Sequence, residues 1–443
     1  MKAANGALRP GPVSLRLFVA CLVANLMVRG FLALLPGYSM DMRDYKRWAM
    51  AIATTGLGSV YETTKVDYPP LFLYALWPVG KLYLAVGLRD AGGDLADSRR
   101  WTALIKLPHV VFDLLLAWML AHLVGHRNMW GAVRAGPGWG RLAALLYLWN
   151  PAVLWGSGFW GQPDGGHSLL ALAAFAALGG DRFLVAGALM AAAGLMKPLA
   201  APLVPTLIVV AAVRGGVRGV VQAAAAGLAT ACVVLLPFIV GGDGATVARR
   251  LVVDLNAMPF SSLNAHNLWW LVGGWQPADV PRLAGFTFQT VGLCLFLVAG
   301  GFLLWRARSW LAAGGDATTR AAGVMVLGAA AATSFFFLTT HMHENHMFMA
   351  LAFLLAVAGR TPALGRLALA ASVAVFANMV LHHPPVGRPG GIFGWPSPVF
   401  DPLFHRPFTW LQMVGSYLNT ALVAIVAAGT YAVAWRWPRS RRE

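Results

Sequence analysis

Long apolar runs alternate with short polar segments over almost the whole chain, and most of these runs are long enough for helices that cross a bilayer. A crossing helix needs about 20 predominantly apolar residues. The pattern predicts an all-α integral membrane protein in which residues 1–443 form a single polytopic domain with about twelve membrane-spanning helices. The runs assigned to them are 15–35, 102–124, 142–159, 166–180, 182–197, 198–213, 217–240, 285–305, 321–339, 345–359, 363–381 and 409–435.

The apolar run at residues 69–90 does not fit this alternation. Pro78, Gly80 and Lys81 interrupt it, and a complete crossing there would turn every later basic loop to the opposite side. We therefore expect an in-plane or re-entrant element, which is tolerated where its backbone is packed in protein. The alternative is a full span that is paired with a further helix elsewhere in the chain.

The charged residues fix the expected orientation and exclude several classes of protein. The chain is 58% hydrophobic and only 12% charged, which leaves no room for a sizeable soluble domain. Its net charge of +17 comes from short basic clusters between apolar runs. This is the positive-inside pattern and not a nucleic-acid footprint, so the expected partner is the lipid bilayer, and no nucleic acid is expected. The loops expected on the non-cytoplasmic side are 37–101, which should carry amphipathic helices, 242–284 and 382–407.

Polar residues gather in segments that this topology places on one face. Besides 37–68, 242–284 and 382–407, they are 160–167 and 341–346. Charged and amide groups at membrane depth are costly unless they are paired or face a wet cavity. The sequence thus predicts a site built on helix ends. The three cysteines are far apart in apolar runs, so we expect neither a disulfide framework nor a metal knuckle.

The first loop carries the leading candidate residues. Tyr45, Trp48 and Ile52 share one helical face, which suggests an amphipathic helix lying on the bilayer, with Asp44 near its start. A simple membrane anchor is the alternative interpretation. Asp67 and Tyr68 end the loop.

Two further groups suit a phosphate. His341, His343 and Glu344 follow an aromatic run; they favour anion binding, while a metal pair and an inert helix cap are alternatives. Lys197 is a lone cation between two short helices, where the alternatives are a phosphate partner and a lysine that snorkels to the interface. At mid-helix, Asp113 is expected to pair with Lys106 or His109.

A last group suits a sugar, because amides bond hydroxyl groups and indole faces stack on C–H surfaces. The candidates from this group are Asn264, His266, Asn267 and Trp269, together with Gln162 and Asp164 of the 159–164 motif. An aromatic belt at the membrane interface explains the tryptophans equally well.

Several of these short segments resemble the sequences of a known superfamily. The stretch from Asp44-Tyr45 to residues 67–71 (Asp-Tyr-Pro-Pro-Leu) resembles the endoplasmic-reticulum glucosyltransferases that use dolichyl-phosphate-glucose, as does His343-Glu344. Residues 161–164 and 264–269 look more like bacterial relatives of the mannosyltransferase that acts on glycosylphosphatidylinositol. Both groups belong to the GT-C superfamily of polytopic glycosyltransferases. Asn345 stands where the eukaryotic pattern has lysine.

The resemblance implies transfer of a hexose, glucose or mannose, from a polyprenyl-phosphate-linked donor to a lipid-linked or glycan acceptor on the non-cytoplasmic face, with inversion and without a cofactor or metal. Asp44, and not Asp41, would be the general base. The donor phosphate would be held by Lys197, His343, Glu344 and His341. Sugar or acceptor contacts would come from Asp67, Tyr68, Gln162, Asp164, Asn264, His266, Asn267 and Trp269.

Two other classes remain open at this stage. A lipid-linked-sugar flippase or transporter would share the helices and the wet polar groups, although its polar residues should follow a pathway through the midplane. A non-enzymatic scaffold would not need Asp44, Lys197 and His343 together. For the location we expect a multi-pass protein of a bacterial-type inner membrane more than of the endoplasmic reticulum.

Overall fold

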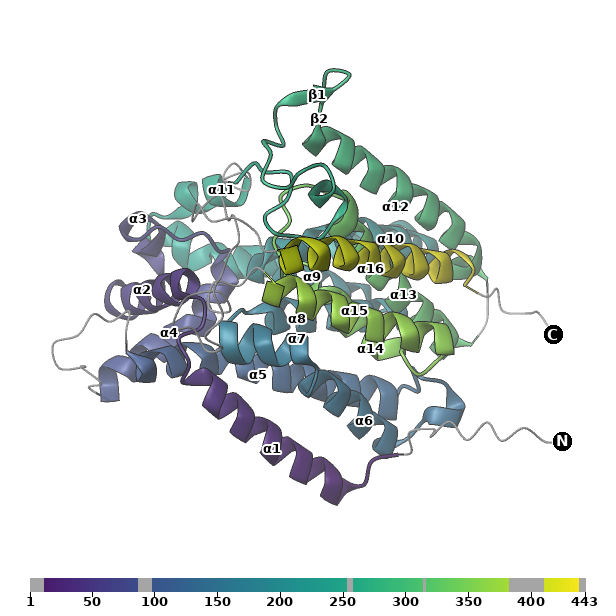
Figure 1. Ribbon diagram of the computed structural model, residues 1–443, viewed down its shortest axis with the longest axis horizontal. Helices are drawn as coiled ribbons and strands as arrows, with labels where there is room; N and C mark the ends of the chain where they lie inside the picture. The colour runs from purple at the N-terminus through teal and green to yellow at the C-terminus, as the bar shows by residue number, and fades with distance from the viewer. Residues whose placement is uncertain (1–11, 87–97, 253–257, 314–315, 382–409, 438–443) are drawn as a thin grey trace.

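The computed structural model describes residues 12–86, 98–252, 258–313, 316–381 and 410–437, almost all of them in helices (Figure 1). The loop expected at 382–407 and the residues 87–97 of the first loop lie outside the described residues. The elements are α1 (Leu15–Ala33), α2 (Ser39–Thr55), α3 (Val60–Thr63), α4 (Pro70–Val86), α5 (Arg99–Gly125), α6 (Pro137–Leu148), α7 (Pro151–Val153), α8 (Asp164–Gly179), α9 (Phe183–Met196), α10 (Val204–Val240), α11 (Gly244–Val252), β1 (Pro281–Leu283), β2 (Phe286–Thr287), α12 (Phe288–Ala312), α13 (Ala317–Leu338), α14 (Phe348–Val357), α15 (Pro362–Leu381) and α16 (Trp410–Trp435).

Seven helices in the described part of the chain are long and apolar enough to cross a membrane, and the number becomes eight if α6 and the bent segment after it count as one span. The all-α membrane class is confirmed, whereas the expected twelve spans are not. The difference arises in part because two of the predicted runs form shorter apolar helices, α9 and α14. The run at 69–90, which is not counted as a span, forms the short apolar helix α4. Two other predicted runs meet in α10 at Gly216, whose φ of 58° and ψ of −154° break the helical path.

The bundle is densely packed at its centre and apolar at its rim. Every residue of α14 is buried, and so are most residues of α13 beside it. By contrast, α1 buries only Asn25 and Arg29, and α12 leaves large side chains such as Phe302 and Trp305 exposed. Exposed apolar side chains on long helices are what contact with lipid requires. The first turn of α1 and the last turn of α16 lie at one end of the bundle, and α2, α3 and α11 lie at the other (Figure 1).

The first loop folds back into the protein and not onto the bilayer. The shared face of Tyr45, Trp48 and Ile52 is buried as expected, but its neighbours are protein side chains. The Tyr45 ring contacts Phe72 of α4 at 5.1 Å and His109 of α5 at 5.9 Å between ring centroids. The expectation of a helix lying on the bilayer is therefore wrong for this face, because α4 and α5 cover it.

An ion pair inside the membrane ties α1 to α5. The Arg29 guanidinium donates to Asp113 Oδ2 at 2.8 Å, and both side chains are at most 1% exposed. Tyr147 and Ser157 also donate hydrogen bonds to Asp113. The expected partners Lys106 and His109 are thus wrong: Lys106 donates to the carbonyl oxygens of Leu32 and Leu35 instead.

The contact between α9 and α10 yields a prediction about folding. A Cβ atom at Gly187 would collide with the backbone of Ala223, whereas one at Gly194, on the same helix, would meet nothing within 4 Å. Gly187→Val should separate the helices and lower the thermal unfolding midpoint sharply, since overpacking costs about 1–3 kcal/mol or more. Gly194→Ala should leave it unchanged. Thermal unfolding of both variants in detergent tests this, and equal midpoints would contradict the packing.

Candidate functional site

Polar side chains from five distant segments meet at the N-terminal end of α8. We call this set the polar cluster, and it consists of Asp41, Tyr68, Gln162, Asp164, Lys197 and Asn345. The segments expected at 37–68, 160–167 and 341–346 therefore do lie together. Residues 258–279 lie beside them, because Leu263 N–H donates to the Met342 carbonyl oxygen at 2.9 Å.

Asp164 and Gln162 owe their positions to a break in the chain. Residues 154–160 form a π-helix, and Gly161 ends it with a φ of 89°. Asp164 then lies in the first turn of α8, where the helix dipole favours a carboxylate. Its side chain is 2% exposed, so the cluster must supply its partners.

Lys197 supplies the balancing charge. It caps α9 in an extended conformation, with φ −156°, directly before Pro198. Its ammonium donates to Asp164 Oδ1 at 2.6 Å and to Gln162 Oε1 at 3.4 Å. The Lys197 side chain is 8% exposed. The alternative of a lysine that snorkels to the interface is therefore wrong, because the Lys197 ammonium pairs with Asp164 inside the protein.

Asn345 completes the shell around Asp164. Its amide Nδ2 donates to Asp164 Oδ2 at 2.8 Å. The residue that departs from the glucosyltransferase pattern is thus an integral part of the cluster, in which a lysine would add a second buried cation. Sequence reasoning gave no role to Asn345, and only the proximity of Asp164 discloses one.

Asp41 is the carboxylate of the first loop that reaches the cluster. Trp160 donates to Asp41 Oδ2 at 2.8 Å, and the Gln162 amide donates to the same oxygen. Burial raises the pKa of Asp41 to about 6 against the opposing effect of these hydrogen bonds and of Lys197. The side chain remains half-buried, so it keeps an accessible edge.

Asp44 lies one helical turn further along and outside the cluster. Its side chain is 36% exposed and forms a 3.5 Å ion pair with Arg47. Partial burial raises its pKa, with a smaller contribution from the neighbouring Asp67, which is itself exposed. Asp44 and Asp67, the carboxylates preferred from the sequence, are thus more exposed than the cluster, and Asp41 is the carboxylate that bonds into it.

Tyr68 links the first loop to the cluster. Its hydroxyl donates to Gln162 Oε1 at 3.2 Å and accepts from Tyr45 at 3.0 Å. The Lys197 ammonium lies 5.7 Å from the Tyr68 ring centroid. Burial raises the pKa of Tyr68 to about 12, so the hydroxyl keeps its proton and acts as a donor.

Histidines line the cluster on the α13–α14 side. His343 is 40% exposed, and its Nδ1 lies 3.9 Å from Glu344 Oε2, within ion-pair range but beyond a hydrogen bond. Desolvation, with Lys197 nearby, lowers the pKa of His343 to about 4, so the imidazole is neutral at pH 7. His341, at a φ of 64°, shares a hydrogen bond between its Nδ1 and the Thr340 hydroxyl.

Two buried histidines leave polar atoms without hydrogen bonds. In the described part of the chain, neither ring nitrogen of His109 has a hydrogen-bond partner, and His167 lacks one of normal geometry. His167 Nδ1 lies 4.0 Å from Asp164 Oδ1, and the His109 ring packs against Tyr45. A buried polar atom without a partner costs about 1–3 kcal/mol. Such atoms beside the cluster indicate a place where a polar molecule would be stabilised.

The amide-rich group at 264–269 organises a loop. The Asn267 side chain accepts from the backbone N–H groups of Trp269 and Trp270 and donates to the Thr339 carbonyl oxygen. The backbone oxygen of Asn264 and the backbone N–H of His266 both bond the Asn378 amide. The Trp269 indole donates to the Leu338 carbonyl oxygen at 2.7 Å. These polar groups are used within the protein, so their contact with a sugar stays a prediction.

The cluster can bind and position a polar group. Within the described residues, no three His, Cys, Asp or Glu side chains form a group that could hold a metal ion. The cysteines lie elsewhere: Cys21, Cys232 and Cys294 are on α1, α10 and α12. What the cluster offers is a carboxylate and a phenol beside a buried ion pair, with the neutral imidazole of His343 next to it.

The raised pKa of Asp41 gives a prediction about pH. Between pH 3.8 and about 6 the folded protein holds a proton that the unfolded chain releases, so this group makes stability fall as pH rises through that window. Asp41→Asn should remove roughly 1–2 kcal/mol of that fall, a value reduced for partial solvent screening. Thermal unfolding at pH 4.5 and 7.5 measures it. Asp67→Asn, at an exposed site, should follow the wild type, and identical profiles for Asp41→Asn would contradict the assignment.

The comparison with known families changes the interpretation of this site. Residues 13–249 match the family described as GPI transamidase subunit PIG-U. No curated protein matches the chain. The matched residues carry Asp41, Tyr68, Gln162, Asp164 and Lys197, and so most of the polar cluster.

The match overturns the expected activity. Its family is that of a transamidase subunit, so the expectation of a hexosyltransferase that uses a polyprenyl-phosphate sugar is wrong. The alternative of a lipid-linked-sugar flippase is wrong for the same reason. The multi-pass membrane location holds, but the preference for a bacterial-type inner membrane receives no support. The similarity to GT-C enzymes is limited to short segments, whereas the family match extends over residues 13–249.

Proposed function

The chain belongs to the family of the GPI transamidase subunit PIG-U, and we propose that it is a non-catalytic membrane subunit that binds the head group of a glycosylphosphatidylinositol-type lipid for a transamidase complex. In this role the protein partners supply the acyl-transfer chemistry. The chain holds the lipid in the bilayer and presents its polar end.

The residue types of the cluster favour binding over covalent chemistry. Transamidation replaces the amine of an amide with another amine, and enzymes commonly do this through an activated serine or cysteine next to a base. In the described part of the chain, the cysteines lie on α1, α10 and α12, away from the cluster. The cluster instead holds carboxylates, amides and a lysine that are already bonded to one another.

The observation that carries the proposal is the difference in burial between the ion pair and the polar side chains around it. The Lys197–Asp164 pair is buried and charge-balanced, while Asp41, Tyr68 and His343 are only partly buried. A head group with hydroxyls, a phosphate and the amine that transamidation needs would find both donors and acceptors there. The partly charged Asp41 suits the amine, and the neutral His343 can donate to phosphate oxygens, while the Tyr68 hydroxyl orients Gln162.

Co-purification and loss of function test this role. When the chain is purified in mild detergent, protein partners that include a candidate acyl-transfer enzyme should co-purify with it. Cells that lack it should fail to attach a reporter protein to the lipid and should accumulate free lipid. Restoration by the wild type but not by Lys197→Met is expected. Normal attachment in cells without the chain would overturn the proposal.

A further inference from the structure

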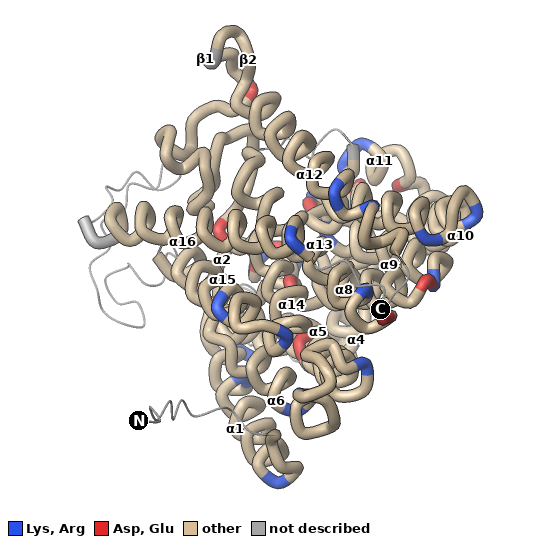
Figure 2. The backbone as a smooth tube through the Cα atoms, turned by 90° about the vertical axis from the view of Figure 1, so that its right-hand side faces the viewer, with Lys and Arg blue, Asp and Glu red and all other residues tan. Residues whose placement is uncertain are grey.

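A short β-hairpin projects from the bundle directly before α12 (Figure 1, Figure 2). Its strands β1 and β2 pair antiparallel. The turn between them contains Ala284 and Gly285, whose φ values are 50° and 89°. Tight turns with positive φ at both central residues match the twist of paired strands. The hairpin is therefore a small protrusion of defined shape.

The turn of the hairpin belongs to the same uncharged run as α12. Residues 283–305 contain no charged side chain, and Arg282 and Arg306 bound this run at its two ends. The helix α12 is also one of those long and apolar enough to cross a membrane. The uncharged run thus begins in the hairpin and not at the first residue of the helix.

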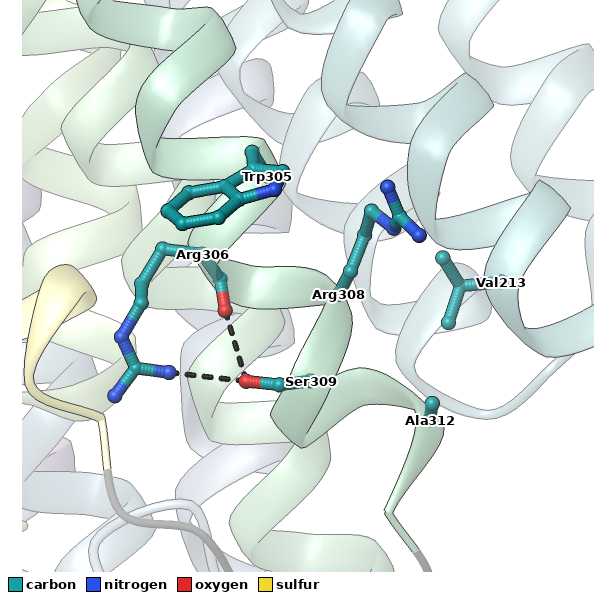
Figure 3. A pocket seen from close by; sticks show the side chains of 6 residues that line it. All are labelled: Val213, Trp305, Arg306, Arg308, Ser309 and Ala312. Carbon is teal, nitrogen blue, oxygen red and sulfur yellow. Dashed lines mark hydrogen bonds between the residues drawn. The ribbon is translucent and has the colours of Figure 1, made fainter.

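The far end of α12 marks one boundary of the bilayer. Trp305 is 63% exposed next to Arg306, and the side chains of Arg306 and Arg308 point to opposite sides of the helix (Figure 3). Exposed indoles and long cationic side chains are typical of the level of the lipid head groups. A crossing takes about 20 residues, and the 20 residues before Arg306 are 286–305. The opposite boundary therefore falls at the hairpin.

Apolar side chains of the hairpin are exposed at this second boundary. Phe286 is 59% exposed and Val280 is 44% exposed. Phe286 comes two residues before α12, whose exposed side chains include Leu293 and Leu297. These side chains of a spanning helix face lipid, so the hairpin continues an apolar surface that already contacts the bilayer. Unpaired strand edges are excluded from the hydrocarbon core, which leaves the interface as their place.

Backbone hydrogen bonds tie the base of the hairpin to the loops beside the polar cluster. Gln289 N–H donates to the Ala278 carbonyl oxygen at 3.0 Å, and Ala278 N–H donates to the Pro259 carbonyl oxygen at 2.7 Å. Next along the chain, the Phe260 carbonyl oxygen accepts from His341 N–H at 3.0 Å. The depth of the hairpin in the membrane is therefore coupled to the position of these loops.

We propose that the tip of the hairpin inserts into the lipid head-group region at this end of α12. Phe286 and Val280 bury apolar surface against the upper acyl chains, and Arg282 extends its guanidinium to the lipid phosphates. The hairpin thereby sets the depth at which residues 258–279 lie beside the polar cluster. The occupant is the bilayer, because the uncharged run of α12 reaches its full crossing length only when the hairpin is included. This anchor does not depend on the role proposed for the polar cluster.

Spin labels measure the depth of the hairpin directly. A nitroxide is attached to Phe286→Cys in nanodiscs of phosphatidylcholine, and serine replaces the native cysteines Cys21, Cys232 and Cys294. Oxygen concentrates in hydrocarbon and a nickel chelate stays in water, so the ratio of the two collision rates reports insertion. The ratio at position 286 should exceed severalfold the ratio at Glu62→Cys, an exposed site on α3. It should approach the ratio at Val298→Cys, which is 57% exposed on α12.

A second variant tests the role of the aromatic ring. With the label at Val280→Cys, the added change Phe286→Ser should lower the ratio toward that of Glu62→Cys, and an unchanged ratio would show that Phe286 is not the anchor. A ratio at position 286 equal to that of Glu62→Cys would place the hairpin in water and overturn the proposal. Shielding from nickel only after protein partners are added would assign the surface to a protein and overturn it as well. Thermal unfolding of each labelled chain should match that of the unlabelled one.

Discussion

Lys197→Met is expected to destabilise the protein by about 3–5 kcal/mol and to abolish head-group binding. The substitution leaves the Asp164 carboxylate, which is 2% exposed, without its cation at 2.6 Å. Removal of one partner from a buried ion pair costs this much because the remaining charge stays desolvated. The fall in the thermal unfolding midpoint measures the first effect, and binding of labelled lipid measures the second.

Two further variants separate the effects. Lys197→Met combined with Asp164→Asn removes both charges and should recover most of the stability, yet it should not recover binding. Lys197→Arg keeps the charge and should retain more stability than Lys197→Met. A Lys197→Met protein within about 1 kcal/mol of the wild type would show that the pair is not buried as described.

Arg29→Leu should be comparably damaging, through a different pair. It leaves Asp113, fully buried between α1 and α5, with hydrogen bonds from Tyr147 and Ser157 but no cation. A lone carboxylate at membrane depth is costly, so a loss of about 3–5 kcal/mol or failure to accumulate is expected. Yield and thermal unfolding in detergent are the measurements.

The same helix provides the control. Arg16 lies on α1 and is exposed, so Arg16→Leu removes an equal charge without touching Asp113 and should be nearly neutral. Arg29→Leu with Asp113→Asn should regain stability relative to Arg29→Leu alone. If Arg16→Leu and Arg29→Leu lower the midpoint equally, the role of the buried pair is refuted.

The helices could be predicted from the sequence because apolar length and periodicity are local properties. The runs at 15–35, 102–124 and 363–381 match α1, α5 and α15 closely. The shared buried face of Tyr45, Trp48 and Ile52 follows from the sequence for the same reason, because helical spacing is local. What covers that face depends on α4 and α5, and periodicity alone does not distinguish a protein neighbour from lipid.

The partners of the buried charges could not be predicted, because they depend on distant contacts. Lys197 and Asp164 are 33 residues apart, and Arg29 and Asp113 are 84 apart. One local signal does indicate the second pair. Arg29 is a lone cation within an apolar run, and such a residue needs an acidic partner inside the protein. Asp113 was the matching lone carboxylate.

The choice between Asp41 and Asp44 illustrates a second limit. Both lie in the first turns of α2. The direction in which each side chain leaves the helix decides which of them reaches Trp160 and Gln162. Motif similarity favoured Asp44, but the side chain that reaches the cluster is Asp41. The prediction of function has the same limit: short motifs resemble glycosyltransferases, whereas the family match extends over residues 13–249.

Direct binding of lipid to the purified chain tests the central claim. The measurement is the affinity of a glycosylphosphatidylinositol-type lipid with a free amine for the wild-type chain in nanodiscs, compared with Asp41→Asn, with Tyr68→Phe and with Arg218→Gln as control. The account predicts saturable one-to-one binding that is weakened about tenfold in Asp41→Asn and clearly in Tyr68→Phe, and is unchanged in the control. No saturable binding to the wild type, or equal affinity in all four proteins, would contradict it.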